Sequence, residues 1–221
     1  MMNFVARQFS NPHGVLGWLV GRSMARSNGD FSRWTGLQVQ QHVKQTPRRI
    51  VEIGPGPGIG LEVLLQRFPE ARVWGIDRSR EMVRASTRHN RSAVEDGRLS
   101  VLHGDVSALR DLAPVDLVVA NHVLYFWSDP EQVLTIIREC LGPGRSIALG
   151  YQLRHNMPSM AQEQFPRAGF RLYDSERDVA GVLEAAGFVG ITHQIKGSAD
   201  RVAGRLSLAT VAPSIESSTK A

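Results

Sequence analysis

A glycine-rich loop behind an acidic residue is the first feature of the chain that could hold a ligand. In the stretch IVEIGPGPGIG, residues 50–60, four glycines alternate with prolines and an isoleucine after a run of apolar residues. Glycines in this position let the backbone turn sharply and approach a ligand closely, as at the strand-to-helix corner of a nucleotide-binding α/β domain. The loop therefore predicts a ligand site, and the glycines alone leave several adenosine-bearing ligands open.

The same loop disfavours ligands that carry phosphate groups. In both registers of the dinucleotide fingerprint G-x-G-x-x-G, the third glycine position holds an aliphatic residue, Ile59 or Leu61. No Gly-Lys-Ser/Thr follows the loop, and Pro55 and Pro57 have no backbone N–H to offer an anion. A ligand without phosphates suits this loop better.

Three acidic residues come at or near the ends of three successive β-type runs. Glu52 stands two residues before the first glycine, Asp77 ends the run VWGID, and Asp105 ends the run VLHGD. A carboxylate at position 77 can accept hydrogen bonds from both ribose hydroxyls of an adenosine, and one at position 105 can accept from an exocyclic amine. A negative charge at position 52 repels a pyrophosphate but suits an ammonium or a sulfonium. The acids therefore predict an adenosine with a cationic tail.

The elements that must position these residues alternate along the chain. β-type runs at 49–53, 71–77, 99–105, 115–121 and 146–151 are separated by helical patterns near 60–68, 80–90 and 129–140. Such alternation predicts a parallel sheet with helices on both faces. In a sheet of this kind ligands bind outside the carboxyl ends of the strands, where the loop and the acids would meet.

Both ends of the chain and one internal stretch depart from this alternation. Helical patterns at 15–27 and 32–44 predict a helical preface in front of the sheet. After a helix that starts at Ser175, two β-type runs follow with no helix between them and are predicted to be antiparallel. Residues 152–173 show no regular pattern, which favours a functional loop or lid, although a tolerated surface insertion would look the same.

In this order and spacing the motifs resemble those of the class I S-adenosylmethionine-dependent methyltransferases. The family's E/D-x-G-x-G-x-G loop is matched from Glu52 to Gly58, its ribose acid by Asp77, its adenine-side acid by Asp105, and its L-x-P-G-G turn by LGPGR, which departs at Arg145. The resemblance covers roughly residues 50–212. It implies a three-layer, doubly wound, Rossmann-like α/β fold with a seven-stranded sheet, an antiparallel last strand pair and an N-terminal helical cap.

The resemblance implies S-adenosyl-L-methionine as the cofactor and assigns a set of residues to it. The expected cofactor-binding residues are Glu52, Gly54, Pro55, Gly56, Gly58, Asp77, Arg78, Gly104, Asp105, Val106 and Asn121. No metal site is expected, because the chain has one cysteine and its histidines and acids show no ligand-like spacing.

The segment ANHVLYFW, residues 120–127, is expected to face the transferred methyl group. His122 is the candidate general base, because imidazole titrates near neutral pH, and a structural hydrogen-bonding role is its alternative. Tyr125, with the aromatic residues that follow it, could form a wall for a sulfonium or a planar acceptor, or could only pack in the core. His122 and Tyr125 are therefore the predicted catalytic residues.

Length and composition limit the remaining possibilities. The 221 residues favour one domain, divided into a helical cap at 1–48, a cofactor-binding domain at 49–212 and a flexible tail at 213–221. The single cysteine favours a reducing cytoplasm, and no apolar run is long enough to cross a membrane. Arg80, Arg84, Arg88 and Arg91 fall on or near one face of a predicted helix, but no aromatic residues are interleaved with them as a nucleic-acid platform requires, which favours a solvated face.

The predicted function is therefore methyl transfer to oxygen, nitrogen or carbon of a small molecule. The stretch FSNPHGVLGWLVGRSMARSN at 9–28, taken together with NHVLYFW, looks like a bacterial subgroup of small-molecule methyltransferases. The expected partner is the small-molecule acceptor, without nucleic acid or stable membrane insertion, and with a homodimer left open. A non-catalytic S-adenosylmethionine-binding module and a lipid-like or macromolecular acceptor are the alternatives.

Overall fold

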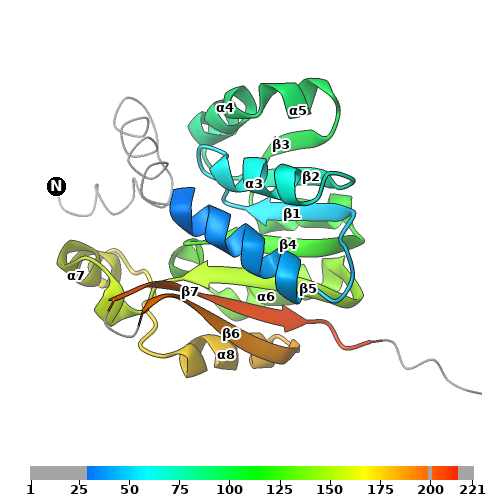
Figure 1. The fold of residues 1–221 in the computed structure, drawn as a ribbon. Helices are drawn as coiled ribbons and strands as arrows, with labels where there is room; N and C mark the ends of the chain where they lie inside the picture. The colour runs from blue at the N-terminus through cyan, green and yellow to red at the C-terminus, as the bar shows by residue number, and fades with distance from the viewer. Residues whose placement is uncertain (1–28, 199–200, 214–221) are drawn as a thin grey trace, which may run out of the picture.

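A seven-stranded sheet forms the centre of the protein in a computed structural model, which describes residues 29–198 and 201–213 (Figure 1). The strands are β1 (Arg49–Ile53), β2 (Arg72–Asp77), β3 (Leu99–His103), β4 (Val115–Asn121), β5 (Leu141–Tyr151), β6 (Val189–Ser198) and β7 (Arg201–Thr210). The α-helices are α3 (Ile59–Arg67), α4 (Arg80–His89), α5 (Arg91–Glu95), α6 (Pro130–Cys140), α7 (Ser159–Arg167) and α8 (Glu176–Ala185). Short 3₁₀ helices are η1 (Val106–Leu112), η2 (Leu124–Phe126) and η3 (Arg154–Asn156). A further helix, here called the front helix, covers residues 29–42.

The order of the strands confirms the predicted fold class. The order is β3-β2-β1-β4-β5-β7-β6, with β1 to β5 parallel and β7 antiparallel to both of its neighbours. Strand order reverses at β1, because β2 and β3 lie on one side of it and β4 and β5 on the other. In doubly wound sheets this is where ligands bind, outside the carboxyl ends of the strands.

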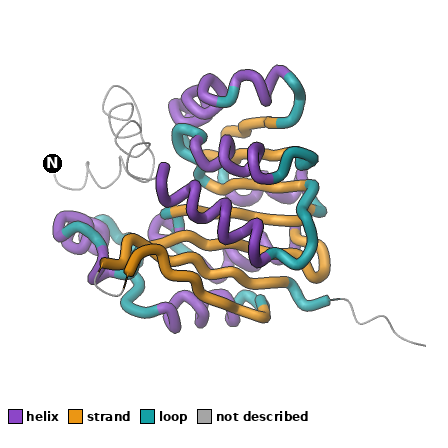
Figure 2. The backbone as a smooth tube through the Cα atoms, in the orientation of Figure 1, coloured by secondary structure: helices purple, strands orange, loops and turns teal. Residues whose placement is uncertain are grey.

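Two apolar layers pack against the two faces of the sheet. On one face Val118 and Ile147 belong to a buried cluster with Leu134 of α6 and Val179 of α8. On the other face the front helix and α3 contribute Val39 and Leu61 to a second buried cluster, and Figure 2 shows the front helix crossing the strands. The strands at the centre of the sheet, β1 and β4, are covered on both faces and are mostly apolar, as buried parallel strands are, whereas the edge strand β6 is largely exposed.

Several boundaries differ from the predicted ones. The front helix begins three residues earlier and ends two residues earlier than the predicted 32–44, and α7 occupies part of the stretch that was expected to be irregular. The turn LGPGR is counted within β5, whose pairing with β4 jumps from Val115–Leu141 to Leu117–Ser146. This bulge places Arg145 at the amino-terminal end of the strands, away from the ligand end. The predicted helix at 15–27 lies outside the described residues.

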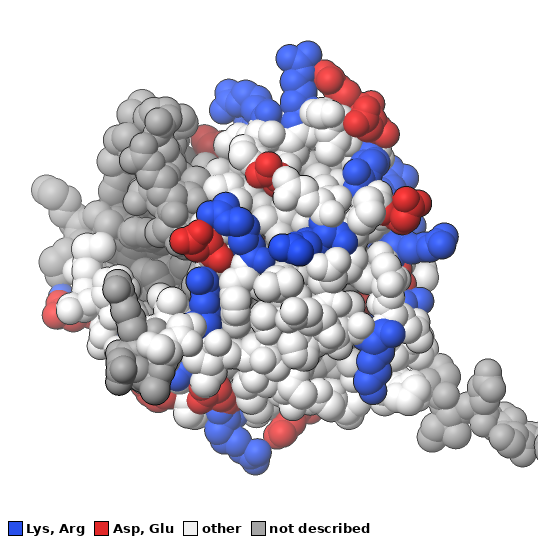
Figure 3. Space-filling model, in the orientation of Figure 1, with Lys and Arg blue, Asp and Glu red and all other residues white. Residues whose placement is uncertain are grey.

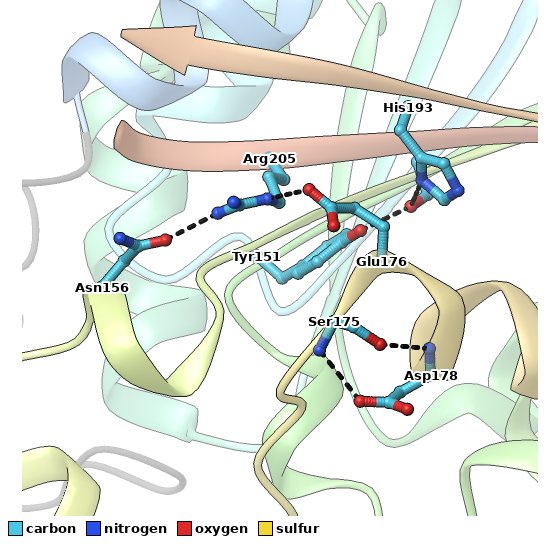
Figure 4. Close-up of polar contacts among 8 residues, drawn as sticks. Tyr151, Asn156, Ser175, Glu176, Asp178, His193 and Arg205 are labelled. Atoms are coloured by element: carbon cyan, nitrogen blue, oxygen red, sulfur yellow. Dashed lines mark hydrogen bonds and ion pairs between the residues drawn. The ribbon is translucent and has the colours of Figure 1, made fainter. Parts of the chain in front are cut away.

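The segment around α7 is held at both of its ends. Arg205 of β7 binds Asn156, where the segment leaves the sheet, and Glu176, where it returns to α8 (Figure 4). The backbone N–H of Arg154 also donates to the carbonyl of Tyr173 at 2.8 Å. Beside this clamp Ser175 and Asp178 form the capping box that starts α8. The segment at 152–175, here called the excursion, therefore leaves the sheet and returns to it with both ends held by these contacts.

The surface gives limited information about partners. On the face seen in Figure 3, basic and acidic side chains are interspersed and do not form a continuous basic block. No helix in the described ranges has both the length and the apolar character that crossing a membrane requires.

Candidate cofactor and methyl-transfer site

A pocket of about 390 Å³ opens at the carboxyl ends of β1 to β4. Its wall combines the glycine loop, the residues that follow β2, β3 and β4, part of α6, and Ser32 of the front helix. The predicted cofactor residues that line it are Glu52, Gly54, Pro55, Gly56, Asp77, Arg78, Gly104, Asp105, Val106 and Asn121. The fold thus gathers into one cavity predicted residues from Glu52 to Asn121, 69 positions apart in the sequence.

Positions 54 and 58 both require glycine, but for different reasons. Both have left-handed backbone, with φ of +66° at Gly54 and +96° at Gly58. A Cβ at Gly54 would lie 2.5 Å from the Val123 side chain at the pocket wall. Gly58 is not among the residues that line the pocket, and a Cβ there would lie 2.9 Å from the Cα of Ser86 in α4. Gly58 therefore lets α3 start close against α4, which a count of loop glycines does not reveal.

Replacing Gly58 by alanine should cost more stability than replacing Gly97, a turn glycine with a φ of +71°. An added Cβ at Gly97 would meet no described atom within 4 Å, so this control bears only the left-handed strain, about 1–2 kcal/mol. Gly58→Ala adds the overlap with the Ser86 backbone, for a further loss of about 1–3 kcal/mol. Urea unfolding of both variants measures the difference, and equal losses would contradict the assigned packing role.

Asp77 holds the glycine loop and faces the pocket at the same time. Its carboxylate accepts from the backbone N–H of Gly56 at 3.0 Å and from that of Ser79 at 2.9 Å. The side chain is buried, and burial raises its pKa to about 6, against the opposing effect of these two donors. Each oxygen keeps a lone pair, because a carboxylate can accept about four hydrogen bonds. Asp77 is therefore ionised at neutral pH and can accept from a ligand hydroxyl.

Asp105 offers a more exposed acceptor on the other side of the pocket. It caps η1, and its Oδ1 accepts from the N–H and the hydroxyl of Ser107. These hydrogen bonds keep the pKa of Asp105 below its ordinary value. Gly104 before it donates its N–H to the carbonyl of Asp77 at 3.0 Å, which fixes the two acids relative to each other.

Glu52 is the least satisfied polar group in this wall. Its side chain is 3% exposed, and its Oε2 has no hydrogen-bond partner among the described residues. Burial raises the pKa of Glu52 to about 8, although a hydrogen bond from Asn121 works in the opposite direction. A buried carboxyl without a counter-ion, at the edge of a pocket, fits a cationic ligand group such as the ammonium of S-adenosylmethionine. The residues present therefore fit that cofactor.

His122 lies in the pocket wall in an unusual backbone conformation. It has a φ of 56°, and its backbone N–H donates to the carbonyl of Gly150 at 2.7 Å. Its ring lies against Phe31 of the front helix, with 4.4 Å between the ring centroids. Burial lowers the pKa of His122 to about 4, so the imidazole is uncharged at neutral pH. It is thus free to accept a proton, but it is a weak base in this structure.

Tyr125, the second residue predicted to be catalytic, is not among the residues that line the pocket. Its ring is buried, its hydroxyl hydrogen-bonds with the backbone of Gln152, and burial raises its pKa. The aromatic residues of this turn that line the pocket are Phe126 and Trp127, and Phe126 packs against Phe165 and Phe170 of the segment around α7. In this structure Tyr125 takes the alternative role named for it in the sequence, which is packing in the core.

Some lining residues were not expected from the sequence. Ser32 comes from the front helix, and Gln132, Val133 and Ile136 come from α6. The helical pattern of α6 by itself assigns Val133 and Ile136 to the core. Nothing in the sequence pattern distinguishes Gln132 or Ser32 as pocket residues. Residues 29–198 and 201–213 contain no group of three or more His, Cys, Asp or Glu placed to hold a metal ion.

Comparison with known proteins agrees with this geometry. A family model described as a methyltransferase domain matches residues 30–193. Trans-aconitate 2-methyltransferase of Azoarcus sp. (strain BH72) is 34% identical over 110 residues, 50% of this chain and 41% of that protein. Malonyl-(acyl-carrier protein) O-methyltransferase of Chlorobium phaeovibrioides (strain DSM 265 / 1930) is 31% identical over 137 residues, 60% of this chain and 51% of that protein. The chain spans about two fifths to one half of the length of these curated relatives.

The fold is also that of solved methyltransferases. Human N-acetylserotonin methyltransferase, in complex with S-adenosylmethionine, superposes with a TM-score of 0.63 at 20% identity, covering 84% of this chain and 52% of that one. The family match covers the glycine loop, the three acids and the end of β4. The chain therefore belongs to the methyltransferase-domain family, within the class I S-adenosylmethionine-dependent methyltransferases.

Proposed function

We propose that the protein transfers a methyl group from S-adenosylmethionine to oxygen, nitrogen or carbon of a small molecule. The observation that carries the proposal is the buried Glu52 carboxyl, whose Oε2 has no partner among the described residues at the edge of a pocket that Asp77 and Asp105 also line. Three acids around one cavity, with no backbone donor at Pro55 or Pro57, suit a cationic adenosine better than a phosphate.

The roles of the three acids follow from their surroundings. We infer that Glu52 holds the ligand's ammonium, that Asp77 accepts from its ribose hydroxyls, and that Asp105 accepts from its exocyclic amine. When bound, S-adenosylmethionine supplies a methyl group already activated by a sulfonium. The chain's remaining task is to align the acceptor in line with that methyl and to exclude water from the pocket.

His122 remains the proposed general base. Its neutral imidazole can take a proton from an acceptor hydroxyl or amine, and its low pKa limits it to acceptors that lose their proton easily. Phe126 and Trp127 line the same pocket and form the proposed wall beside a planar or apolar acceptor. The relatives' names give trans-aconitate and malonyl-(acyl-carrier protein) as acceptors, which supports a small molecule or a carrier-bound acyl group.

Titration calorimetry with S-adenosylmethionine and with NAD tests the ligand class. We expect binding of S-adenosylmethionine and no heat with NAD, because the loop lacks the dinucleotide fingerprint. Tight NAD binding with no response to S-adenosylmethionine would overturn the proposal. Incubation of an extract with methyl-labelled cofactor, followed by mass spectrometry for the gain of one methyl, then identifies the acceptor. Binding without transfer to any acceptor would favour the non-catalytic module.

Other features of the proposal rest on the sequence. A cytoplasmic location follows from the single cysteine, which is buried as Cys140 in α6. The domain boundaries at residues 48 and 212, the homodimer, and independence from metal and nucleic acid also stay predictions.

A further inference from the structure

The front helix is fixed against the carboxyl end of the sheet by one aromatic side chain. Phe31 is 4% exposed, and its ring lies between Gly150 of β5 and Gly204 of β7. A Cβ at Gly150 would lie 2.6 Å from this ring, and one at Gly204 would lie 2.4 Å from it. Only glycine leaves room for the ring at these two positions, so the front helix has a defined register on the sheet.

One turn further along the front helix, Thr35 reaches the pocket wall. Its side chain is buried, and its hydroxyl donates to Oδ1 of Asn121 at 3.2 Å. The same Oδ1 lies 2.2 Å from where a Cβ of Gly150 would be, so the amide oxygen fills the space above that glycine. The oxygen end of the Asn121 amide is thus directed to the front helix and β5.

The NH₂ group at the other end of this amide is directed to the Glu52 carboxyl. Glu52 pairs with Val119 on β4, so Asn121, two residues further on, lies on the same face of the sheet and lines the pocket with Glu52. Hydrogen bonding from the Asn121 side chain favours the ionised form of Glu52 and so lowers its pKa. A carboxylate can only accept, so it needs the NH₂ group of the amide and would be repelled by the amide oxygen. Which end of Asn121 faces Glu52 therefore decides whether the carboxylate is supported.

We propose that Thr35 is a positioning residue for the cofactor: its hydroxyl holds Asn121 in the orientation that presents the amide NH₂ to Glu52. The carboxylate is thereby kept ready for the ligand's ammonium. This inference rests on the proposed function, because it takes S-adenosylmethionine as the ligand. It makes the front helix part of the cofactor site, through a residue that does not itself line the pocket.

The isosteric variant Thr35→Val removes the hydroxyl and keeps the shape. We expect it to weaken S-adenosylmethionine binding about 5- to 10-fold in titration calorimetry at pH 7, the loss typical of one buried hydrogen bond. Thr35→Ser should restore most of the affinity. Thr87→Val in α4 is the matched control, because among the described residues the Thr87 hydroxyl donates to the carbonyl of Val83 and to no pocket residue. This variant should bind S-adenosylmethionine as the wild type does.

The pH profile separates positioning from general loss of structure. The other titratable groups that line the pocket with Glu52 are Asp77 of β2, Arg78 after it, Asp105 after β3 and His122 after β4. Hydrogen bonds from Ser107 keep the pKa of Asp105 low, and His122 stays neutral above pH 6. Affinity for S-adenosylmethionine, plotted against pH, should change where each of these carboxyls ionises. Thr35→Val should move the change caused by Glu52, the Glu52 step, to higher pH and leave the change caused by Asp77 in place. A general loosening of the fold would not move the Glu52 step alone.

A double-mutant cycle with Asn121→Ala decides the mechanism. If Thr35 acts through Asn121, adding Thr35→Val to Asn121→Ala causes no further loss of affinity. Additive losses, wild-type affinity in Thr35→Val, or an equal loss in Thr87→Val would each overturn the inference. If Thr35→Val does not fold, Thr35→Ala gives the same readouts. A wild type that does not bind S-adenosylmethionine would instead refute the proposed function.

Discussion

Replacing Glu52 by glutamine is expected to stabilise the ligand-free protein at alkaline pH and to weaken the binding of S-adenosylmethionine. The pKa of Glu52 is raised from 4.5 to about 8 by burial, so ionising it inside the fold costs free energy. Each unit of pKa difference between the folded and unfolded states corresponds to about 1.4 kcal/mol. Glutamine keeps the shape without the charge, and we expect it to raise the free energy of unfolding by about 2 kcal/mol or more at pH 8.5.

The direction of the pH dependence follows from the raised pKa. The unfolded chain ionises Glu52 near 4.5 and the folded chain near 8, so the contribution of Glu52 to stability is greatest below 4.5 and is lost as the pH rises through this window. Asp77 adds a similar fall between 3.8 and about 6. Urea unfolding at pH 5, 7 and 8.5 should show the fall above pH 6 in the wild type, and its absence in Glu52→Gln. Parallel curves for the two proteins would contradict the burial of an ionisable group at this position.

Binding should show the opposite preference. The ligand's ammonium needs the ionised carboxylate, so binding at pH 7 should release about one proton, and affinity should rise nearly tenfold per pH unit from pH 6 to 7.5. Above this range the ligand's own amine, with a pKa of about 7.7–8.0, begins to lose its charge. Glu52→Gln should release no proton and bind about 10- to 100-fold more weakly. Calorimetry in buffers of different ionisation enthalpy measures the proton release, and an unchanged release in the variant would assign it to another group.

Asp77→Ala is the second substitution with a large expected effect, on cofactor affinity. Asp77 accepts from the backbone N–H groups of Gly56 and Ser79 while it lines the pocket. Its removal deletes the acceptor for the ribose hydroxyls and leaves the glycine loop without one of its supports. We expect S-adenosylmethionine binding to weaken by about 1–3 kcal/mol, on the order of 10- to 100-fold.

The control for Asp77→Ala is Asp111→Ala, which removes an exposed acid in η1 that does not line the pocket. Its affinity for the cofactor should equal that of the wild type. Titration with adenosine alone adds a second measurement, because the ribose contact is present in both ligands and the ammonium contact in only one. Full affinity of Asp77→Ala for both ligands would show that the ribose contact is wrongly assigned.

Much of the site was predictable because the chemistry of each acid is carried by its residue type and its place at a strand end. The β-type runs that end in Asp77 and Asp105 and surround Glu52 are parallel strands in the structure, and their carboxyl ends meet at one edge. Parallel order forces that meeting, whatever the loops between the strands contain. The positions of these three acids therefore followed from the sequence pattern.

Residues that follow β4 were harder to predict, because the direction of a side chain there depends on one backbone angle. His122 has a positive φ, which is uncommon for a residue other than glycine and has no signature in the sequence. The turn that follows brings Phe126 to the pocket and packs Tyr125 in the core, although both are aromatic and adjacent. Aromatic character alone could not separate the two.

By itself, the sequence determined the alternation of strands and helices, the glycine loop and the three acids, because periodicity, glycine conformation and charge are local properties. Only the tertiary structure decided that Gly58 packs against α4, that α7 belongs to a clamped excursion, and that Thr35 reaches Asn121. These features depend on contacts between segments that are distant in the chain. Such contacts are fixed by the packing of whole elements, and no short stretch of sequence specifies them.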